Sequence, residues 1–287
     1  MCTRLTDAEC VEVFCRYMND KAKELGMKSS SFTNPAGTGI YNLTTPLDMA
    51  RCFAEASFNK TIRDIWSQTE YTVKTEGEAP REVKIASLTL SGEGTSPLVS
   101  NYKVIGGKGG TLTYQKQYNS GVLVHNPVGE GILACVVMGA DEPRNMPNNI
   151  FEADRQALNN AVNGEKDGSV CARAAVVCRL PRSKGGEIEV LYFKDPEKTE
   201  IPASMTKMVT SLVVLEHLTD LDEKIVITEE MIALVPKGYY QKYIKAGDIV
   251  SVIDLLRTML LVSSNAAAYI FGAVVGRRLA EKMGITV

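Results

Sequence analysis

The chain has 287 residues, of which 45% are hydrophobic and 23% are charged. These values are typical of a globular protein with a packed core, so they exclude a mainly disordered or fibrous chain. The formal net charge of −2 gives no electrostatic reason to expect a nucleic acid or an anionic membrane surface as a partner. The length fits about two domains or one large α/β unit, since roughly 100 to 200 residues per domain is usual.

The cysteines and the first residues of the chain indicate the cellular context. The 7 cysteines form no C-x-x-C pair, and most lie inside apolar runs. We expect small buried side chains with free thiols rather than a disulfide framework, and no metal site or cofactor. The N-terminal residues lack the apolar segment of a signal peptide, and no apolar stretch reaches the roughly 20 residues of a membrane span. The sequence therefore predicts a soluble chain without a visible signal peptide.

The first elements in chain order are helical. Thr6 and Glu9 form a capping box, and apolar residues at spacings of three and four predict a helix over 6–25. A Thr-Pro pair predicts a second helix over 45–58, because proline is tolerated at the first helical position.

The middle of the chain changes to short, β-branched segments bounded by turn residues, which predict strands over 71–140. Two of these segments, 121–125 and 131–138, predict a hairpin. Helical spacing returns over 150–162, and the polar segment 163–169 predicts a flexible connector.

The last third begins with a further hairpin and then becomes mainly helical. Segments 171–180 and 187–193 flank a Gly-rich turn and predict the hairpin. The remaining expected helices are 203–218, 228–235, 251–262 and 264–282.

Several common catalytic templates are absent. The two histidines, His125 and His217, belong to no H-E-x-x-H motif, and no G-x-S-x-G nucleophile elbow occurs. The glycine-rich segment 106–110 lacks the spacing of a Walker loop. We expect both histidines to be structural or surface residues.

Ser204 and Lys207 form a Ser-x-x-Lys tetrad at the start of a strongly apolar helix. Their spacing puts the hydroxyl and the amine on one helix face, where a desolvated lysine can take the serine proton. The tetrad alone is weak evidence, because Ser57 and Ser100 begin the same pattern. An ordinary helix cap with a solvated lysine remains the alternative.

Two further polar elements accompany the tetrad. Ser263 and Asn265 form a Ser-x-Asn between two apolar helices, where another helix cap is the alternative interpretation. Lys108 lies on a glycine-flanked strand that a ligand backbone can approach closely. Ser-x-x-Lys, Ser-x-Asn and a lysine strand are together the motifs of penicillin-recognising serine enzymes.

These motifs, with several longer segments, resemble the D-alanyl-D-alanine carboxypeptidases, serine peptidases among the low-molecular-mass penicillin-binding proteins. The resembling segments cover nearly the whole chain and include 21–28, 32–37, 44–51 and 222–228. The resemblance implies an α/β (α+β) chain with the transpeptidase fold shared by β-lactamases and penicillin-binding proteins. That fold has an antiparallel sheet flanked by helices, together with an all-helical subdomain.

The resemblance also implies a single domain over 1–287. Residues 1–70 and 203–287 would form its mainly helical part. Residues 71–202 would form its mainly sheet part, including the terminal helix 150–162 and the joining linker 163–169.

The order of the motifs differs from the family, in which Ser-x-x-Lys comes first and the lysine strand last. Here Lys108 precedes Ser204. Reading 170–287 and then 1–162 restores the family order, which indicates a circular permutation joined through 163–169. Such a joint is physically reasonable, because domain termini often lie close together at the surface.

By resemblance, Ser204 would attack the carbonyl of a D-Ala-D-Ala peptide bond, and Lys207 would be its general base. Ser263 would relay the proton toward the leaving amine. Asn265 would hold the substrate amide, and Lys108 would supply positive charge for the terminal carboxylate.

The glycine-flanked strand would line the substrate through Gly109, Gly110 and Thr111. The backbone N–H groups of Ser204 and Thr111 would form the oxyanion hole. Two residues depart from the family pattern: Gly109 replaces a Thr or Ser whose hydroxyl binds the carboxylate, and Ala266 replaces a common Asp.

Three functions remain in competition. A carboxypeptidase would act on peptidoglycan peptides ending in D-Ala-D-Ala, would be acylated by β-lactams, and would work outside the cytoplasm as a monomer without a cofactor. A serine β-lactamase or esterase is disfavoured, because the E-x-x-L-N pattern of class A β-lactamases is missing from the relevant interval. Gly109 leaves a non-catalytic penicillin-binding-like sensor or binding module as the other alternative.

Overall fold

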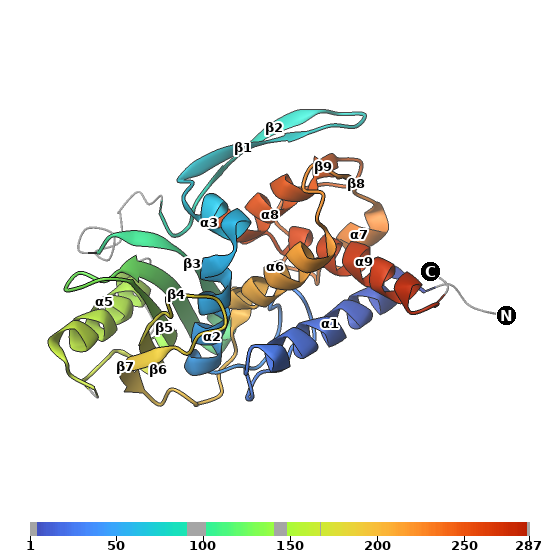
Figure 1. Cartoon of the computed structure of the whole chain (residues 1–287). Helices are drawn as coiled ribbons and strands as arrows, with labels where there is room; N and C mark the ends of the chain where they lie inside the picture. Colours follow the sequence, from blue (N-terminus) through green and yellow to red (C-terminus); the bar gives the residue numbers. More distant parts are fainter. Residues whose placement is uncertain (1–4, 91–101, 141–147, 167, 286–287) are drawn as a thin grey trace.

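The computed structural model describes residues 5–90, 102–140, 148–166 and 168–285. Their central feature is a 5-stranded antiparallel sheet in the order β3-β4-β5-β6-β7 (Figure 1). The strands are Val104–Leu112 (β3), Gln117–His125 (β4), Ile132–Ala140 (β5), Ala172–Arg179 (β6) and Glu189–Lys194 (β7). Both predicted hairpins, β4–β5 and β6–β7, are present, and the predicted antiparallel sheet flanked by helices is confirmed.

The helices surround this sheet and extend well beyond it (Figure 1). They are Asp7–Glu24 (α1), Pro46–Phe58 (α2), Lys60–Trp66 (α3), Asn148–Asn163 (α5), Thr206–His217 (α6), Glu229–Ala233 (α7), Val252–Leu261 (α8) and Asn265–Lys282 (α9). The predicted capping box is confirmed, because Thr6 accepts from the amide of Glu9 and the Glu9 carboxylate accepts from the amide of Thr6. Thr45 caps α2 in the predicted position.

Two apolar cores lie on opposite faces of the sheet. On one face, residues of β4, β5 and β6 such as Val122 and Val137 pack against residues of α5 such as Leu158. Alternate residues such as Leu123 and Val136 point the other way, into the larger core formed with α1, α2, α6, α8 and α9. Because successive side chains of a strand point to opposite faces, the sheet packs against the single helix α5 on one face and against the helical body on the other.

Strand β3 is an edge strand whose glycines allow close packing. A Cβ at Gly106 would lie 2.4 Å from the Cβ of Trp66, at the end of α3. A Cβ at Gly110 would lie 2.4 Å from the carbonyl oxygen of Pro202 and 2.9 Å from the nitrogen of Ser204. Since real side chains do not approach so closely, these glycines let the sheet edge lie directly against the segment that contains Ser204.

Some elements differ from the sequence prediction. Helix α3 was not predicted. Strands were expected within 71–140, but their pairing as the hairpin Glu70–Thr75 with Arg81–Ala86 (β1–β2) was not. The small two-stranded sheet Lys224–Val226 with Ile249–Ser251 (β8–β9) was not predicted either. The helix expected over 203–218 begins as a 3-10 turn, Ala203–Met205 (η2). The helix expected over 228–235 is only 5 residues long.

The expected connector 163–169 is more closely attached than a free linker. The carbonyl oxygen of Lys166 accepts from the amide of Phe193 at 3.0 Å, and that of Gly168 accepts from the Tyr192 hydroxyl at 2.7 Å. Lys166 and Gly168 therefore lie beside β7, whereas a Cβ added at Gly164 would meet nothing within 4 Å.

Helices α1 and α9 pack side by side in opposite directions (Figure 1). Asp7, in the first turn of α1, forms an ion pair with Arg277 near the end of α9. Gly276 makes this approach possible, because a Cβ there would lie 1.9 Å from the carbonyl oxygen of Cys10. The start of the first helix and the end of the last one are therefore neighbours.

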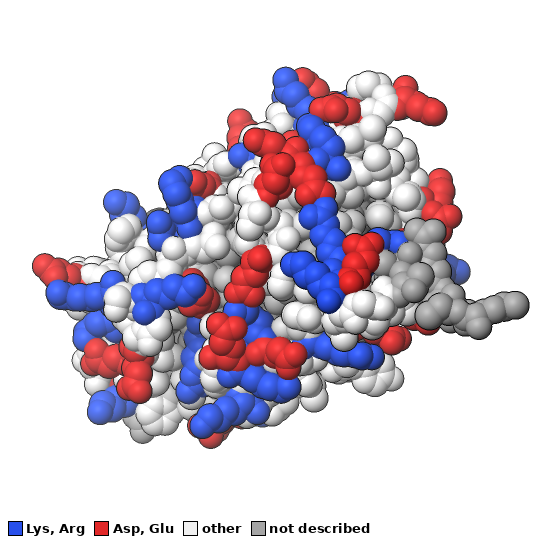
Figure 2. All heavy atoms as spheres, turned by 45° about the vertical axis from the view of Figure 1, so that its right-hand side comes forward, with Lys and Arg blue, Asp and Glu red and all other residues white. Residues whose placement is uncertain are grey.

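The surface carries interspersed charges of both signs. On the face shown in Figure 2, Lys and Arg side chains alternate with Asp and Glu side chains over both the helical body and the sheet region. In the described part of the chain, no helix combines the length and the apolar character that crossing a bilayer requires.

The predicted burial of the cysteines is confirmed for most of those described. Cys10, Cys15, Cys52, Cys135 and Cys178 are buried free thiols, whereas Cys171 is partly exposed. Burial raises the pKa of the Cys52 thiol far above its ordinary value and keeps it protonated at neutral pH. The buried cysteines act as small apolar side chains.

Candidate active site

Ser204 lies in the 3-10 turn η2, which directly precedes α6 in the chain and packs against β3. The preceding residue, Ala203, has a φ of +48°, a left-handed conformation that costs a non-glycine residue energy. The segment that contains Gly37 packs directly against this turn. A Cβ at Gly37 would lie 1.8 Å from the carbonyl oxygen of Ala203, so only a glycine fits at position 37. This turn leaves the side chain of Ser204 partly exposed while that of Lys207 is buried.

Lys207 is fully buried and directly contacts Ser204. Its Nζ lies 2.8 Å from Ser204 Oγ, 2.8 Å from the carbonyl oxygen of Ala36 and 2.7 Å from Asn265 Oδ1. Burial, with additional repulsion from Lys108, holds the pKa of this amine well below its usual value. A neutral amine has two hydrogens and one lone pair. In that form the amine can donate its two hydrogens to Ala36 and Asn265, which leaves the lone pair for the Ser204 hydroxyl.

Asn265 is the first residue of α9 and completes the environment of the amine. Besides accepting from Lys207, it donates from Nδ2 to the carbonyl oxygen of Tyr239 at 2.8 Å. Its backbone amide donates to Gln241 Oε1 at 2.9 Å. These contacts fix the side chain, because each of its polar atoms has a partner.

Ser263 lies at the α8–α9 junction with a φ of +60°. Its Oγ accepts a hydrogen bond from Lys108 Nζ at 2.8 Å, and Lys108 also donates to the carbonyl oxygen of Gly109 at 2.9 Å. Burial without a counter-ion lowers the pKa of Lys108 to about 7. The two lysines are thus both desolvated, and each contacts a different serine.

The predicted site residues other than Lys207 line two neighbouring cavities. A cavity of about 380 Å³ is lined by Ser204, Lys108, Ser263 and the strand residues Gly109, Gly110 and Thr111. A second cavity of about 220 Å³ shares Ser204 and Thr111 with it and adds Asn265. Ser204 therefore lies at the junction of both, and the described lining of either cavity includes no Asp or Glu.

The structure distinguishes among the three Ser-x-x-Lys tetrads. Ser57 Oγ donates to the carbonyl oxygen of Ala54 at 2.6 Å, and Lys60 pairs with Asp64 at 2.5 Å on the surface. Ser57 is buried near the end of α2, whereas Lys60 begins α3 and pairs with an acidic side chain, so the two do not form a nucleophile and base pair. Ser100 lies outside the described residues.

Sequence reasoning missed several residues that hold the site together. Ala36, Tyr239 and Gln241 supply the carbonyl and amide groups described above, and Asn119 on β4 lines the larger cavity. Backbone carbonyls leave no side-chain pattern, so only the fold reveals them. Asn119 precedes the strand expected over 121–125 and lies between the polar residues Gln117 and Ser120, so the sequence did not single it out.

The comparison with known protein families agrees with this geometry. The family model of the D-alanyl-D-alanine carboxypeptidases matches residues 163–276, which include Ser204, Lys207, Ser263 and Asn265. The match covers less than half of the chain and supports a serine peptidase of the D-Ala-D-Ala carboxypeptidase type. No curated protein and no solved structure matches the chain significantly.

Proposed function

We propose that the protein is a serine-type D-Ala-D-Ala carboxypeptidase that acts on peptidoglycan stem peptides through an acyl-enzyme and is acylated by β-lactams. The observation that carries this proposal is the buried Lys207 amine 2.8 Å from Ser204 Oγ, at the edge of a cavity that contains Lys108. A nucleophile beside a base of lowered pKa is the arrangement that covalent catalysis requires.

In the first step, Ser204 Oγ transfers its proton to Lys207 Nζ and attacks the carbonyl carbon of the terminal peptide bond. The N–H groups of Ser204 and Thr111 stabilise the developing oxyanion. When the C–N bond breaks, the departing D-Ala nitrogen takes a proton through Ser263. Water then hydrolyses the ester on Ser204 and regenerates the hydroxyl.

The substrate would be held by charge and by hydrogen bonds. Protonated Lys108 attracts the terminal carboxylate, and the second Nδ2 hydrogen of Asn265 is available for the substrate amide. Gly109 and Gly110 let the peptide lie close to the free edge of β3. Substrates and β-lactams share this carboxylate and carbonyl geometry, so both would reach Ser204.

Two other functions make different demands on the cavity. A serine β-lactamase hydrolyses its acyl-enzyme quickly, for which class A enzymes use a glutamate, and neither described cavity lining contains an acidic side chain. This observation disfavours fast deacylation. A non-catalytic penicillin-binding sensor is the stronger alternative, because Gly109 lacks the hydroxyl expected for productive carboxylate binding.

We also propose that the chain is a circularly permuted member of the family. The antiparallel contact of α1 with α9 supports this, since a short loop from the end of α9 to the start of α1 would make them consecutive helices. The family resemblance favours the cell envelope as the place of action and a monomer as the working form.

The experiment that tests the function is intact-mass spectrometry of the full chain with benzylpenicillin, followed by peptide mapping. We expect one penicilloyl adduct on Ser204 that Ser204→Ala abolishes, with Ser57→Ala as a matched control that keeps it. No adduct at saturating drug, or an adduct elsewhere, would reject the proposal. Release of D-Ala from a D-Ala-D-Ala tripeptide separates a carboxypeptidase from a sensor.

A further inference from the structure

The turn that carries Ser204 is strained, and no side chain caps it. Ala203 is in the left-handed region, and no side chain caps η2 or α6. A strained conformation persists only when its surroundings hold it in place. The residues that contact 200–202, directly before this turn, are therefore candidates for holding it.

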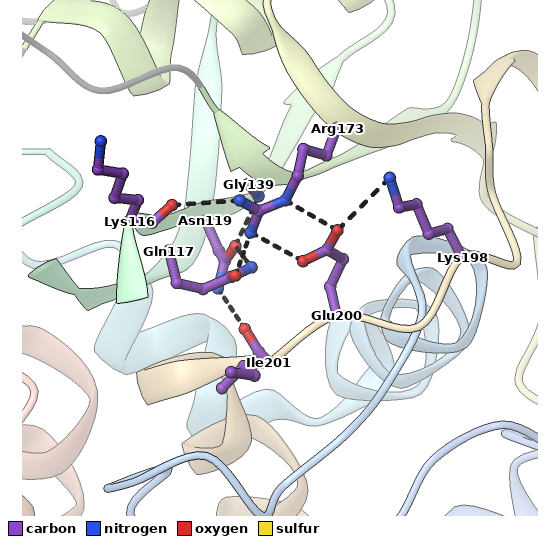
Figure 3. A network of polar contacts seen from close by, with 8 residues as sticks. All are labelled: Lys116, Gln117, Asn119, Gly139, Arg173, Lys198, Glu200 and Ile201. Carbon is purple, nitrogen blue, oxygen red and sulfur yellow. Dashed lines mark hydrogen bonds and ion pairs between the residues drawn. The ribbon is translucent and has the colours of Figure 1, made fainter. Parts of the chain in front are cut away.

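The first support is an ion pair with Glu200. Arg173 on β6 donates from Nε and Nη2 to the two carboxylate oxygens of Glu200 at 2.9 and 2.8 Å (Figure 3). The carboxylate is mostly buried, with 8% of the side chain exposed. Glu200 also exchanges two backbone hydrogen bonds with Thr44. A bidentate pair of this kind fixes orientation as well as position.

The second support is the side chain of Asn119, which is fully buried on β4. Its Nδ2 donates to the carbonyl oxygen of Ile201 at 2.8 Å (Figure 3). Its Oδ1 accepts from Gln117 Nε2 at 2.8 Å and from the amide of Gly139 at 2.9 Å. Gln117 in turn accepts from Arg173, so the two supports form one network.

Gly139 shows how closely this network is packed. Its φ is +60°, and a Cβ there would lie 2.4 Å from Arg173 Nε. Only glycine allows the guanidinium to pass over β5 and reach Glu200. Side chains of β4 and β6, packed against the backbone of β5 at Gly139, therefore contact one short segment, Glu200 and Ile201.

We propose that the network of Arg173, Glu200, Gln117 and Asn119 positions the Ser204 nucleophile by holding the strained turn at Ala203. These are positioning residues that act through the backbone, and the inference rests on the function proposed above. The network anchors the turn to the sheet, so that Ser204 Oγ stays within reach of Lys207 and its amide stays beside Thr111. Small displacements of a nucleophile have large kinetic effects, about 10²-fold for 1 Å.

The test separates the acylation step from binding, using a fluorescent penicillin and the full chain at a temperature well below unfolding. Asn119→Asp keeps the shape and the Oδ1 contacts but replaces the donor to Ile201 with an oxygen. Glu200→Gln removes the charge that Arg173 holds. We expect the limiting acylation rate to fall about 10- to 100-fold in each, with the dissociation constant of the preceding complex changed less than about twofold.

Arg179→Met is the matched control, because Arg179 lies on the same strand as Arg173 and pairs with an exposed glutamate at the far end. It should keep the wild-type rate. A second background, Ala203→Gly, tests the mechanism, since glycine adopts a positive φ without strain. In that background, Asn119→Asp should slow acylation by a clearly smaller factor.

The outcomes are distinguishable. The positioning role would be overturned if both network variants were acylated at the same rate as the control. It would also be overturned if Asn119→Asp weakened the complex and left the limiting rate unchanged, because Asn119 would then be a binding residue. Equal losses from Asn119→Asp in the wild-type and Ala203→Gly backgrounds would show that the turn is not what the network holds. A wild-type chain that formed no adduct would overturn both this inference and the proposed function.

Discussion

The amine of Lys207 lies 2.8 Å from the hydroxyl of Ser204, and its other two contacts are both hydrogen-bond acceptors. To act as a base the amine must be uncharged, which its lowered pKa favours, and it can then keep its two hydrogens on Ala36 and Asn265. Lys207→Met should therefore slow β-lactam acylation by roughly 10² to 10⁴, the range for loss of a positioned base. Stopped-flow acylation kinetics measure this. Lys60→Met, in the tetrad that begins at Ser57, is the control and should have no effect. An undiminished acylation rate in Lys207→Met would show that Lys207 is not the base.

The pH dependence of binding should report Lys108. Its pKa is lowered to about 7, so the amine is charged below that pH and progressively neutral above it. Attraction for the ligand carboxylate is therefore present below pH 7 and lost as the pH rises. The dissociation constant of the non-covalent β-lactam complex should increase above pH 7, by up to about tenfold per pH unit. Lys108→Met should bind more weakly and without this dependence, whereas an identical pH profile in both proteins would contradict the role.

Gly109 provides a test by gain of function. Its φ lies outside the left-handed region, and the nearest atom to a Cβ there is the carbonyl oxygen of Asn119 at 3.5 Å, so a side chain fits. Gly109→Thr should add a hydrogen bond to the ligand carboxylate, worth about 1.5 to 3 kcal/mol, and raise acylation efficiency roughly 10- to 100-fold. Gly110→Ala is the contrasting control, because its Cβ would collide with Pro202. A flat or reduced rate in Gly109→Thr would show that another group already binds the carboxylate.

The permutation can be tested by moving the ends of the chain. Opening the chain after Gly164 spares the backbone contacts of Lys166 and Gly168 with β7, and a short Gly/Ser linker then joins Val287 to Met1. Loop closure is inexpensive, since doubling a flexible loop costs only about 0.6 kcal/mol. The rearranged protein should melt within a few degrees of the original and still be acylated at Ser204. Opening it within α5 is the control, and should unfold the chain; an insoluble product from the Gly164 opening would contradict the proposed joint.

Local sequence signals were enough to predict most of the helices and strands. Thr6 with Glu9 and Thr45 with Pro46 define helix starts through contacts within four residues, so tertiary structure has little influence on them. Helix α3 was missed because it is only 7 residues long and follows directly after Asn59, which also ends α2. The β8 and β9 strands are 3 residues each, too short for a period of two to appear.

The candidate site was predictable only in part. Ser204, Lys207 and Asn265 occur in short motifs, and the fold brings their polar atoms within hydrogen-bond distance. The third contact of the amine is a backbone carbonyl, that of Ala36, for which no residue type is diagnostic. Arg173 and Glu200 form an ion pair between two segments that contain no recognisable motif. Only the fold explains this pair, because the side chain of Arg173 passes over Gly139 of the neighbouring strand to reach Glu200.

The contact between α1 and α9 also determines when this chain can fold. Helix α1 begins at Asp7 and its partner α9 ends at Lys282, so all the residues between them must be synthesised before the two helices can pack fully. Until then, α1 exposes apolar residues such as Phe14 and Met18 that are fully buried in the finished protein. Contacts so distant in sequence slow folding, and uncovered apolar surface favours aggregation. The nascent chain therefore depends on protection of α1 until α9 has been synthesised.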